Sequence, residues 1–242
     1  DGEQSVTLQH LLIGEVWLCA GQSNMVMPLN GFDYCPISDS NNVIADAPNH
    51  PGIRMVTIKP TVKLSPQEYA EGSWQQPTTE NAPKFSAAAY HYALTLQRTL
   101  QIPIGVITCA WGGSRVEGWL PKEILQTYKD EDLTLIGSDK TPVYLQSMLM
   151  YNGILYPCHK YTIKGFIWYQ GESNVRSSRT YAERLATMVK HWRSIWGQGD
   201  LPFYYVETVP FACEYKEDGY IGALLREAQQ KALSLLSLIL IS

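Results

Sequence analysis

Five apolar runs rich in β-branched residues recur along the chain, and they limit the folds that it can adopt more than any other feature. The runs span residues 13–20, 53–58, 104–110, 163–170 and 203–209, and a sixth candidate spans residues 236–241. Their hydrophobicity is nearly continuous instead of alternating, which is typical of strands buried on both faces of a parallel sheet.

Amphipathic helical patterns separate these runs. Apolar residues keep helical spacing over three stretches, residues 85–100, 181–196 and 221–235. Ser86 or Pro83 is expected to begin the first helix, and Gly197 is expected to end the second. Because alternating strands and helices imply right-handed crossovers, we predict an α/β fold: a three-layer α/β/α sandwich around a central, mostly parallel five-stranded sheet.

The length of 242 residues suits one large α/β domain, and we predict a single domain over residues 1–242. A net charge of −4 without blocks of like charge argues against a nucleic-acid partner. No run is long enough to span a membrane, and the first residues do not resemble a signal peptide. The polar, proline-containing stretches 28–52, 59–84 and 117–147 are expected to be surface insertions that shape a cleft. The oligomeric state is not fixed by the sequence.

The five cysteines are Cys19, Cys35, Cys109, Cys158 and Cys213. Cys19 and Cys109 fall inside predicted buried strands, where cysteine usually packs as a small hydrophobe. The set permits one disulfide, which spacing alone does not assign. No CxxC pair or HExxH motif occurs, so no metal site is expected.

A serine follows the first apolar run, at the position where α/β hydrolases hold a nucleophile. Residues 21–25 read GQSNM, so that Gly21 stands two residues before Ser23. A tight turn there needs glycine's freedom at positive φ, and it would present the hydroxyl at the open end of the sheet. Taken alone, the same residues also fit an ordinary turn serine or a helix N-cap.

Two further turns follow predicted strands and carry polar groups. Residues 111–115 read WGGSR, and the two glycines allow a backbone N–H to reach a developing oxyanion, with a simple turn as the alternative. Residues 168–174 read WYQGESN and offer the Glu172 carboxylate and the Asn174 amide, with an Asx-type turn as the alternative. All three turns lie at the edge where open parallel sheets bind ligands, so together they predict an acyl-transfer site.

The three blocks GQSNM, WGGSRVEGWL and GFIWYQGESN resemble those of the SGNH-hydrolase superfamily, and within it the sialate O-acetylesterase and acetylxylan esterase-like group. Residues 14–19, 85–90 and 225–229 are similar to the same group, so the resemblance covers nearly the whole chain. It implies the flavodoxin-like SGNH sandwich, an acetylated sugar or glycan as substrate, a secreted or periplasmic location, and no metal or organic cofactor.

The resemblance also implies roles for individual residues. Ser23 matches the nucleophile, and the oxyanion hole would consist of the Ser23 and Gly113 N–H groups and the Asn174 side-chain amide. Glu172 is a further catalytic candidate, because in some relatives the glutamate of this block helps to orient the catalytic histidine. Three more residues are candidates for lining the substrate cleft, with an equally good structural interpretation for each: Gln22, Arg115 and Gln170.

The family's last block, Asp-x-x-His or a close variant that supplies the general base, is missing. Serine needs this base because its hydroxyl is a weak nucleophile near neutral pH. None of the five histidines matches the pattern: His10, His50, His91, His159 and His191. We therefore expect either a fragment that lacks this block or a chain whose end departs from the family pattern. A further hypothesis is that an N-terminal domain is lacking as well. Such a chain is expected to be weakly active or inactive alone.

The residues and the resemblance together predict a carbohydrate O-acetylesterase that hydrolyses acetyl esters through an acetyl–Ser23 intermediate. The main alternative is a non-catalytic carbohydrate-binding protein on a degenerate esterase fold, whose tryptophans and tyrosines would stack on sugars. An SGNH lipase or thioesterase is a third hypothesis, and the polar character of the inserted loops argues against it.

Overall fold

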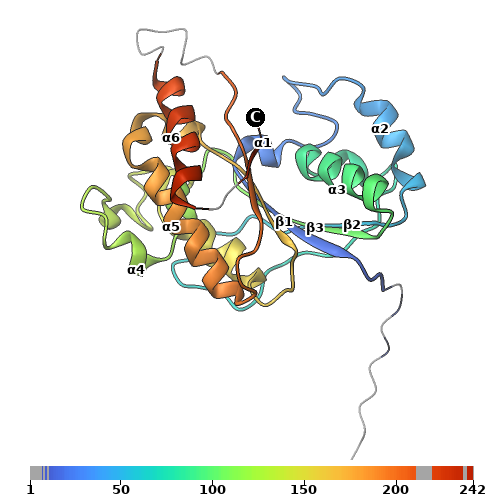
Figure 1. Cartoon of the computed structure of the whole chain (residues 1–242), viewed down its shortest axis with the longest axis horizontal. Helices are drawn as coiled ribbons and strands as arrows, with labels where there is room; N and C mark the ends of the chain where they lie inside the picture. The colour runs from blue at the N-terminus through green and yellow to red at the C-terminus, as the bar shows by residue number, and fades with distance from the viewer. Residues whose placement is uncertain (1–6, 8, 10, 211–219, 237–238, 242) are drawn as a thin grey trace, which may run out of the picture.

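Six parallel strands form one sheet at the centre of the protein, in the order β2-β3-β1-β4-β5-β6. Figure 1 labels β1, β3 and β2, which lie side by side. The computed structural model describes residues 7, 9, 11–210, 220–236 and 239–241. The strands are β1 (Glu15–Gly21), β2 (Ile53–Thr57), β3 (Ile104–Ala110), β4 (Gly165–Tyr169), β5 (Phe203–Val206) and β6 (Ile239–Ile241). The five predicted strands are confirmed. The sixth candidate run is a strand at its end, where it extends the sheet beside β5.

Three long helices and several short ones connect the strands. The α-helices are α1 (Ser23–Val26), α2 (Ser40–Asp46), α3 (Ala87–Leu100), α4 (Lys122–Leu125), α5 (Ser178–Trp196) and α6 (Ile221–Leu235). Short 3₁₀ helices are η1 (Ala47–Asn49), η2 (Ala82–Lys84), η3 (Val116–Trp119), η4 (Leu133–Leu135), η5 (Val143–Leu145), η7 (Tyr156–Cys158) and η8 (Glu172–Ser177). A π-helix, η6 (Tyr151–Leu155), precedes η7.

The long helices begin and end near the predicted signals. Ser86 is the N-cap of α3, and its Oγ accepts the Ala89 N–H at 3.3 Å. Gly197 ends α5 in the left-handed conformation, with φ of +62°. Helix α5 begins at Ser178, three residues before the predicted start at Tyr181, because hydrophobic periodicity marks the first deeply buried side chain and not the polar first turn.

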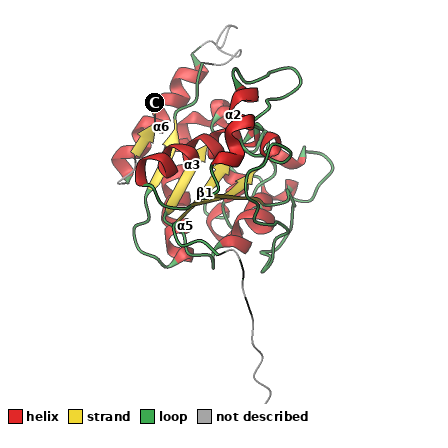
Figure 2. Ribbon diagram, turned by 90° about the vertical axis from the view of Figure 1, so that its right-hand side faces the viewer, coloured by secondary structure: helices red, strands yellow, loops and turns green. Residues whose placement is uncertain are grey.

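The sheet is covered by helices on both faces, as Figure 2 shows. Alternate residues of β1 point to opposite faces. Trp17 and Cys19 pack into a core with α1 and α3, whereas Leu18 and Ala20 pack into the core formed with α5 and α6. This arrangement confirms the predicted three-layer α/β/α sandwich.

Three tryptophans form the centre of the core on the α5 face. The rings of Trp119 and Trp168 meet edge to face with centroids 5.7 Å apart, and Trp192 of α5 lies 5.6 Å from Trp168. All three side chains are fully buried. The prediction that residues 117–147 form a surface insertion is therefore wrong for its first residues, because Trp119 and the stretch around it belong to the core.

Candidate active site

The turns after β1, β3 and β4 lie side by side at the carboxyl edge of the sheet. Gly21 is in register with Ala110 of β3 and with Tyr169 of β4. Hydrogen bonds continue past the strand ends, because the Trp111 N–H donates to the Gly21 carbonyl at 3.0 Å and the Gln22 N–H donates to the Tyr169 carbonyl at 3.0 Å. The sequence correctly predicts that these three turns meet.

Ser23 is the first residue of α1 and is partly exposed at this edge. Gly21 has φ of +151°, and a Cβ there would lie 2.1 Å from the Tyr169 carbonyl oxygen, so the turn requires glycine. Within the described part of the chain, neither the N–H nor the Oγ of Ser23 has a hydrogen-bond partner. Both groups are therefore available to a substrate.

The turn after β3 offers a second free backbone donor. Gly113 has φ of +75°, and a Cβ there would lie 2.9 Å from the Tyr144 ring. The Ser173 hydroxyl donates to the Gly113 carbonyl at 2.7 Å and fixes the peptide that follows. No acceptor among the described residues takes the Gly113 N–H. This N–H is thus not taken by another acceptor, which an oxyanion donor requires. Its role as an oxyanion donor stays a prediction.

Asn174 occupies a different environment from the one expected for an oxyanion donor. Its side chain is fully buried, and its amide nitrogen lies 3.0 and 3.2 Å from the two carboxylate oxygens of Glu117 and 3.2 Å from the Ser177 hydroxyl. Its amide oxygen accepts the Val116 N–H at 2.9 Å and the Gln170 side-chain amide at 2.8 Å. In this arrangement Asn174 ties the third block to the second, and its amide hydrogens are not free for a substrate.

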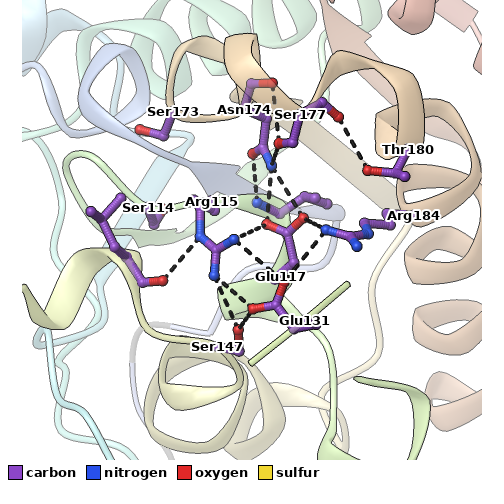
Figure 3. A network of polar contacts seen from close by, with 12 residues as sticks. Ser114, Arg115, Glu117, Glu131, Ser147, Ser173, Asn174, Ser177, Thr180 and Arg184 are labelled. Carbon is purple, nitrogen blue, oxygen red and sulfur yellow. Dashed lines mark hydrogen bonds and ion pairs between the residues drawn. The ribbon is translucent and has the colours of Figure 1, made fainter. Parts of the chain in front are cut away.

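A buried network of charges surrounds this asparagine (Figure 3). Glu117 is fully buried and is ion-paired with Arg184 of α5, and its Oε2 lies 3.7 Å from Nη1 of Arg115. Arg115 also donates to Glu131 at 2.7 Å, and Arg184 donates to Asp130 at 2.7 Å. The sequence patterns did not reveal Glu117, Glu131 or Arg184. The available signal was a charged residue within the otherwise apolar stretch 116–120.

The three residues expected to line the cleft all have structural hydrogen-bond partners. Gln22 is buried, and its amide oxygen accepts the N–H groups of Gly171 at 3.2 Å and Ser173 at 3.4 Å. Gln170 is fully buried and donates to the Ser114 carbonyl at 3.0 Å. The guanidinium of Arg115 is taken up by the charge network. These contacts agree with the structural interpretation of each residue, and a substrate-binding role for Gln22, Arg115 or Gln170 stays untested.

Glu172 has a mostly buried carboxyl group next to the turn that bears Ser23. Its Oε1 accepts the side-chain amide of Asn24 at 2.7 Å, and Asn24 directly follows Ser23. Its Oε2 is buried and has no hydrogen-bond partner. Burial raises the pKa of Glu172 above its usual range. The free Oε2 can therefore accept a hydrogen bond from a group that enters the site.

A cavity of about 190 Å³ lies beside α1 and the turn after β3. Its apolar lining residues include Val26, Ala110 and Trp111, and its polar ones are Thr57, Lys84, Ser86 and Thr108. Ser23 is not among the residues that line it.

None of the four described histidines forms a hydrogen bond with Ser23. Three of them have other partners: His50 bonds to Asp46, His159 to the Tyr156 carbonyl and His191 to the Tyr151 hydroxyl. His91 is exposed on α3, and His10 lies outside the described residues. No described histidine is thus placed to take a proton from Ser23.

The described residues contain no group of three or more His, Cys, Asp or Glu side chains that could hold a metal ion. Within those residues, no helix combines the length and the hydropathy that crossing a membrane requires.

Comparisons with known proteins place the chain among carbohydrate esterases. A family model described as "Carbohydrate esterase, sialic acid-specific acetylesterase" matches residues 13–241. The sialate O-acetylesterases of Pongo abelii and Homo sapiens are each 27% identical to this chain over 204 residues, which is 81% of this chain and 38% of each of those proteins. The chain therefore spans less than half the length of these curated relatives.

Solved structures have the same architecture. A carbohydrate acetylesterase from Xanthomonas citri is 32% identical, with a TM-score of 0.79 over 94% of this chain and 49% of that chain. A protein from Arabidopsis thaliana, at 19% identity and a TM-score of 0.55 over 93% of this chain and 84% of that chain, shares the fold.

Proposed function

Because the chain belongs to the family of sialic acid-specific acetylesterases among the carbohydrate esterases, we propose that it forms the nucleophile-bearing part of a carbohydrate O-acetylesterase. Its substrate would be an O-acetylated sialic acid or another acetylated glycan. One observation carries this proposal. The unpaired Oγ and N–H of Ser23 stand at the edge of the sheet where the turn with the unpaired Gly113 N–H also ends.

In the proposed reaction, Ser23 Oγ attacks the carbonyl carbon of the acetyl ester. The carbonyl oxygen becomes an anion, and the Ser23 and Gly113 N–H groups donate hydrogen bonds to it. Departure of the sugar hydroxyl leaves an acetyl–Ser23 ester, which water hydrolyses to acetate. Removal of one oxyanion donor typically lowers kcat by ~10²–10³-fold.

The attack requires a base that accepts the serine proton. We propose that this base is a histidine other than the four described ones, and that Glu172 orients it. Two observations support the role of Glu172. Asn24 holds one carboxylate oxygen beside the nucleophile turn, and the other oxygen is buried without a partner. An imidazole N–H would satisfy that oxygen.

Acetate release tests the proposal. Protein that includes the complete catalytic machinery is incubated with O-acetylated sialic acid, acetylated xylo-oligosaccharides and p-nitrophenyl acetate. Ser23→Ala should abolish acetate release from the accepted substrates. Ser40→Ala is the matched control, because Ser40 is also the partly exposed first residue of a short helix. Full activity in Ser23→Ala would contradict the assignment.

The 242-residue chain itself is expected to be weakly active. Added imidazole should raise its p-nitrophenyl acetate hydrolysis above that of Ser23→Ala under the same conditions, since small imidazole can act as the base that no described histidine supplies by a hydrogen bond to Ser23. Ordinary turnover without imidazole, abolished by Ser23→Ala, would show that a base is already present.

A carbohydrate-binding protein without catalysis is the second candidate, and the lack of a described base near Ser23 favours it. A serine-directed fluorophosphonate distinguishes the two in the longer protein. Labelling at Ser23 supports the esterase, whereas sugar binding without labelling supports the binding protein. The polar inserted loops do not favour a long-chain lipase or thioesterase.

We also propose a secreted or periplasmic location, which rests on the family resemblance alone. Fractionation of cells that express the natural gene, with detection by an antibody against this chain, tests it. Recovery only in the cytosol would contradict it.

A further inference from the structure

Two cysteines that lie far apart in the sequence meet beside the sheet. Cys109 is in β3 and Cys158 is the last residue of η7, and their Sγ atoms are 3.9 Å apart. The residues are 0% and 8% exposed, respectively. Both thiols also approach the Ile154 carbonyl oxygen, at 3.8 and 3.5 Å, so they point into the same small space.

The separation of the two sulfurs is close to what a covalent bond requires. A disulfide has an S–S distance of about 2.05 Å, so each sulfur would move by about 1 Å. A rotation of each side chain by roughly 30° about its Cα–Cβ bond would supply such a movement, at the limit of what an unstrained rotamer allows. The other described cysteines are placed differently. Cys19 packs in the core on the opposite face of the sheet, and Cys35 is exposed.

We propose that Cys109 and Cys158 form a disulfide when the protein folds in the presence of a small-molecule disulfide such as oxidised glutathione. The proposal rests on the placement of the two thiols and is independent of the esterase assignment. It also selects one pair from a set of five cysteines whose spacing leaves the pairing open.

The chemistry is thiol–disulfide exchange. The Cys158 thiolate, which is the more exposed, attacks one sulfur of oxidised glutathione, forms a mixed disulfide and releases one glutathione thiolate. The Cys109 thiolate then attacks the Cys158 sulfur and releases the second glutathione. Two protein thiols are oxidised, one glutathione disulfide is reduced to two thiols, and the two thiol protons go to the solvent or to the glutathione thiolates.

Exchange should be faster during folding than afterwards. Burial and the neighbouring Cys158 thiol raise the pKa of the Cys109 thiol, so that little thiolate exists in the native state. The same burial would shield the finished disulfide from reductants.

The bond would link two parts of the molecule that bear on the active-site edge. Cys109 is two residues before Trp111, where the glycine turn begins. The segment that ends at Cys158 includes Asn152, which bonds to the backbone of Lys63 and Gln67 and so holds the inserted loop 59–84. A disulfide would therefore tie that loop and the strand before the oxyanion turn to one another.

Peptide mapping tests the proposal on the wild-type chain. Protein is unfolded in urea, refolded with reduced and oxidised glutathione or with reductant alone, denatured in acid, and alkylated. Mass spectrometry should find a Cys109–Cys158 cross-linked peptide pair that is lighter by two hydrogen atoms, with Cys19 and Cys35 alkylated. Alkylation of both Cys109 and Cys158 in the glutathione-refolded protein, or a link from either to another cysteine, would overturn the proposal.

Thermal unfolding gives a second measurement. Oxidised protein should melt roughly 5–15 °C above reduced protein, because the cross-link restricts the unfolded chain. The difference should disappear in Cys158→Ala and persist in Cys35→Ala. A difference that persists in Cys158→Ala would show that another bond is responsible. If Cys158→Ala does not fold, the wild-type peptide map still decides the question.

Discussion

Removal of the Glu117 carboxylate should destabilise the protein strongly. The side chain is fully buried and accepts hydrogen bonds from Arg184 and Asn174, with Arg115 close to its second oxygen. Glu117→Gln keeps the shape of the side chain but removes its charge and converts one acceptor into a donor. This new donor would face the N–H groups of Arg184 or Asn174, and the Arg184 guanidinium would lose its most buried partner.

The size of the loss follows from the remaining partners. Removal of one member of a buried ion pair costs about 3–5 kcal/mol. The Arg184 side chain is only 3% exposed, but it keeps Asp130 at 2.7 Å and Glu131 at 3.5 Å. We therefore expect a loss of about 3 kcal/mol in the free energy of unfolding, near the lower limit. For a chain of this size that corresponds to a fall in Tm of roughly 6–12 °C.

Urea unfolding at neutral pH, followed by circular dichroism, measures this loss. The matched control is Glu183→Gln, because Glu183 is the exposed neighbour of Arg184 on α5 and should change stability by no more than about 0.5 kcal/mol. A double-mutant cycle with Arg184→Gln should give a coupling energy of about 0.5–3 kcal/mol. A loss in Glu117→Gln as small as in the control would refute the argument that this carboxylate anchors buried cations.

Three further predictions concern the turns and a helix cap. Gly113→Ala and Gly197→Ala each place a side chain at a residue with positive φ, at a cost of about 1–2 kcal/mol. Only the new Cβ at position 113 also meets a ring, that of Tyr144, so urea unfolding should show a larger loss of stability for Gly113→Ala. Equal losses for the two variants would argue against that contact. The free energy of unfolding of Glu172→Gln, relative to that of wild type, should be higher at pH 7 than at pH 4. Burial raises the pKa of Glu172, and the stability that its protonated form provides is lost as pH rises through that value; urea midpoints that show the same difference at both pH values would contradict this. Ser86→Ala should lose about 1 kcal/mol in the same assay, because the α3 N-cap is removed, and no loss would mean that the cap contributes nothing.

The sheet could be predicted from the sequence because burial on both faces leaves a direct record in the residues. Every residue of β3 is buried, and its predicted and observed ranges are identical. The range predicted for β5 was too long at its end, since Thr208 leaves the sheet and its N–H and hydroxyl bond to the Gln229 side chain of α6. That contact joins segments that are distant in the sequence, and no pattern within residues 203–209 indicates it.

The location of the candidate site could be predicted from the sequence, but the hydrogen bonds and ion pairs between its side chains could not. The three blocks show where the turns meet, because parallel strands end at one edge. The side-chain partners of Asn174 depend on Glu117, which belongs to another block, and on the burial of Arg184 in a helix that reads as amphipathic. Such pairings are set by the packing of segments that are distant in sequence, so residue type alone suggested a free amide donor at position 174.

The strand order has a consequence for how this protein is made. Within this sheet, β1 is translated before the other five strands but occupies the middle, and its partners arrive much later: Glu15 pairs with Ile104, and Trp17 pairs with Gly165. Such distant pairings slow folding and leave apolar strands uncovered during synthesis. The turn that bears Ser23 is thus translated before the two turns that it meets, and it takes its final shape only after they have arrived. A nascent chain would expose an apolar β1 until β3 and β4 have been translated and docked.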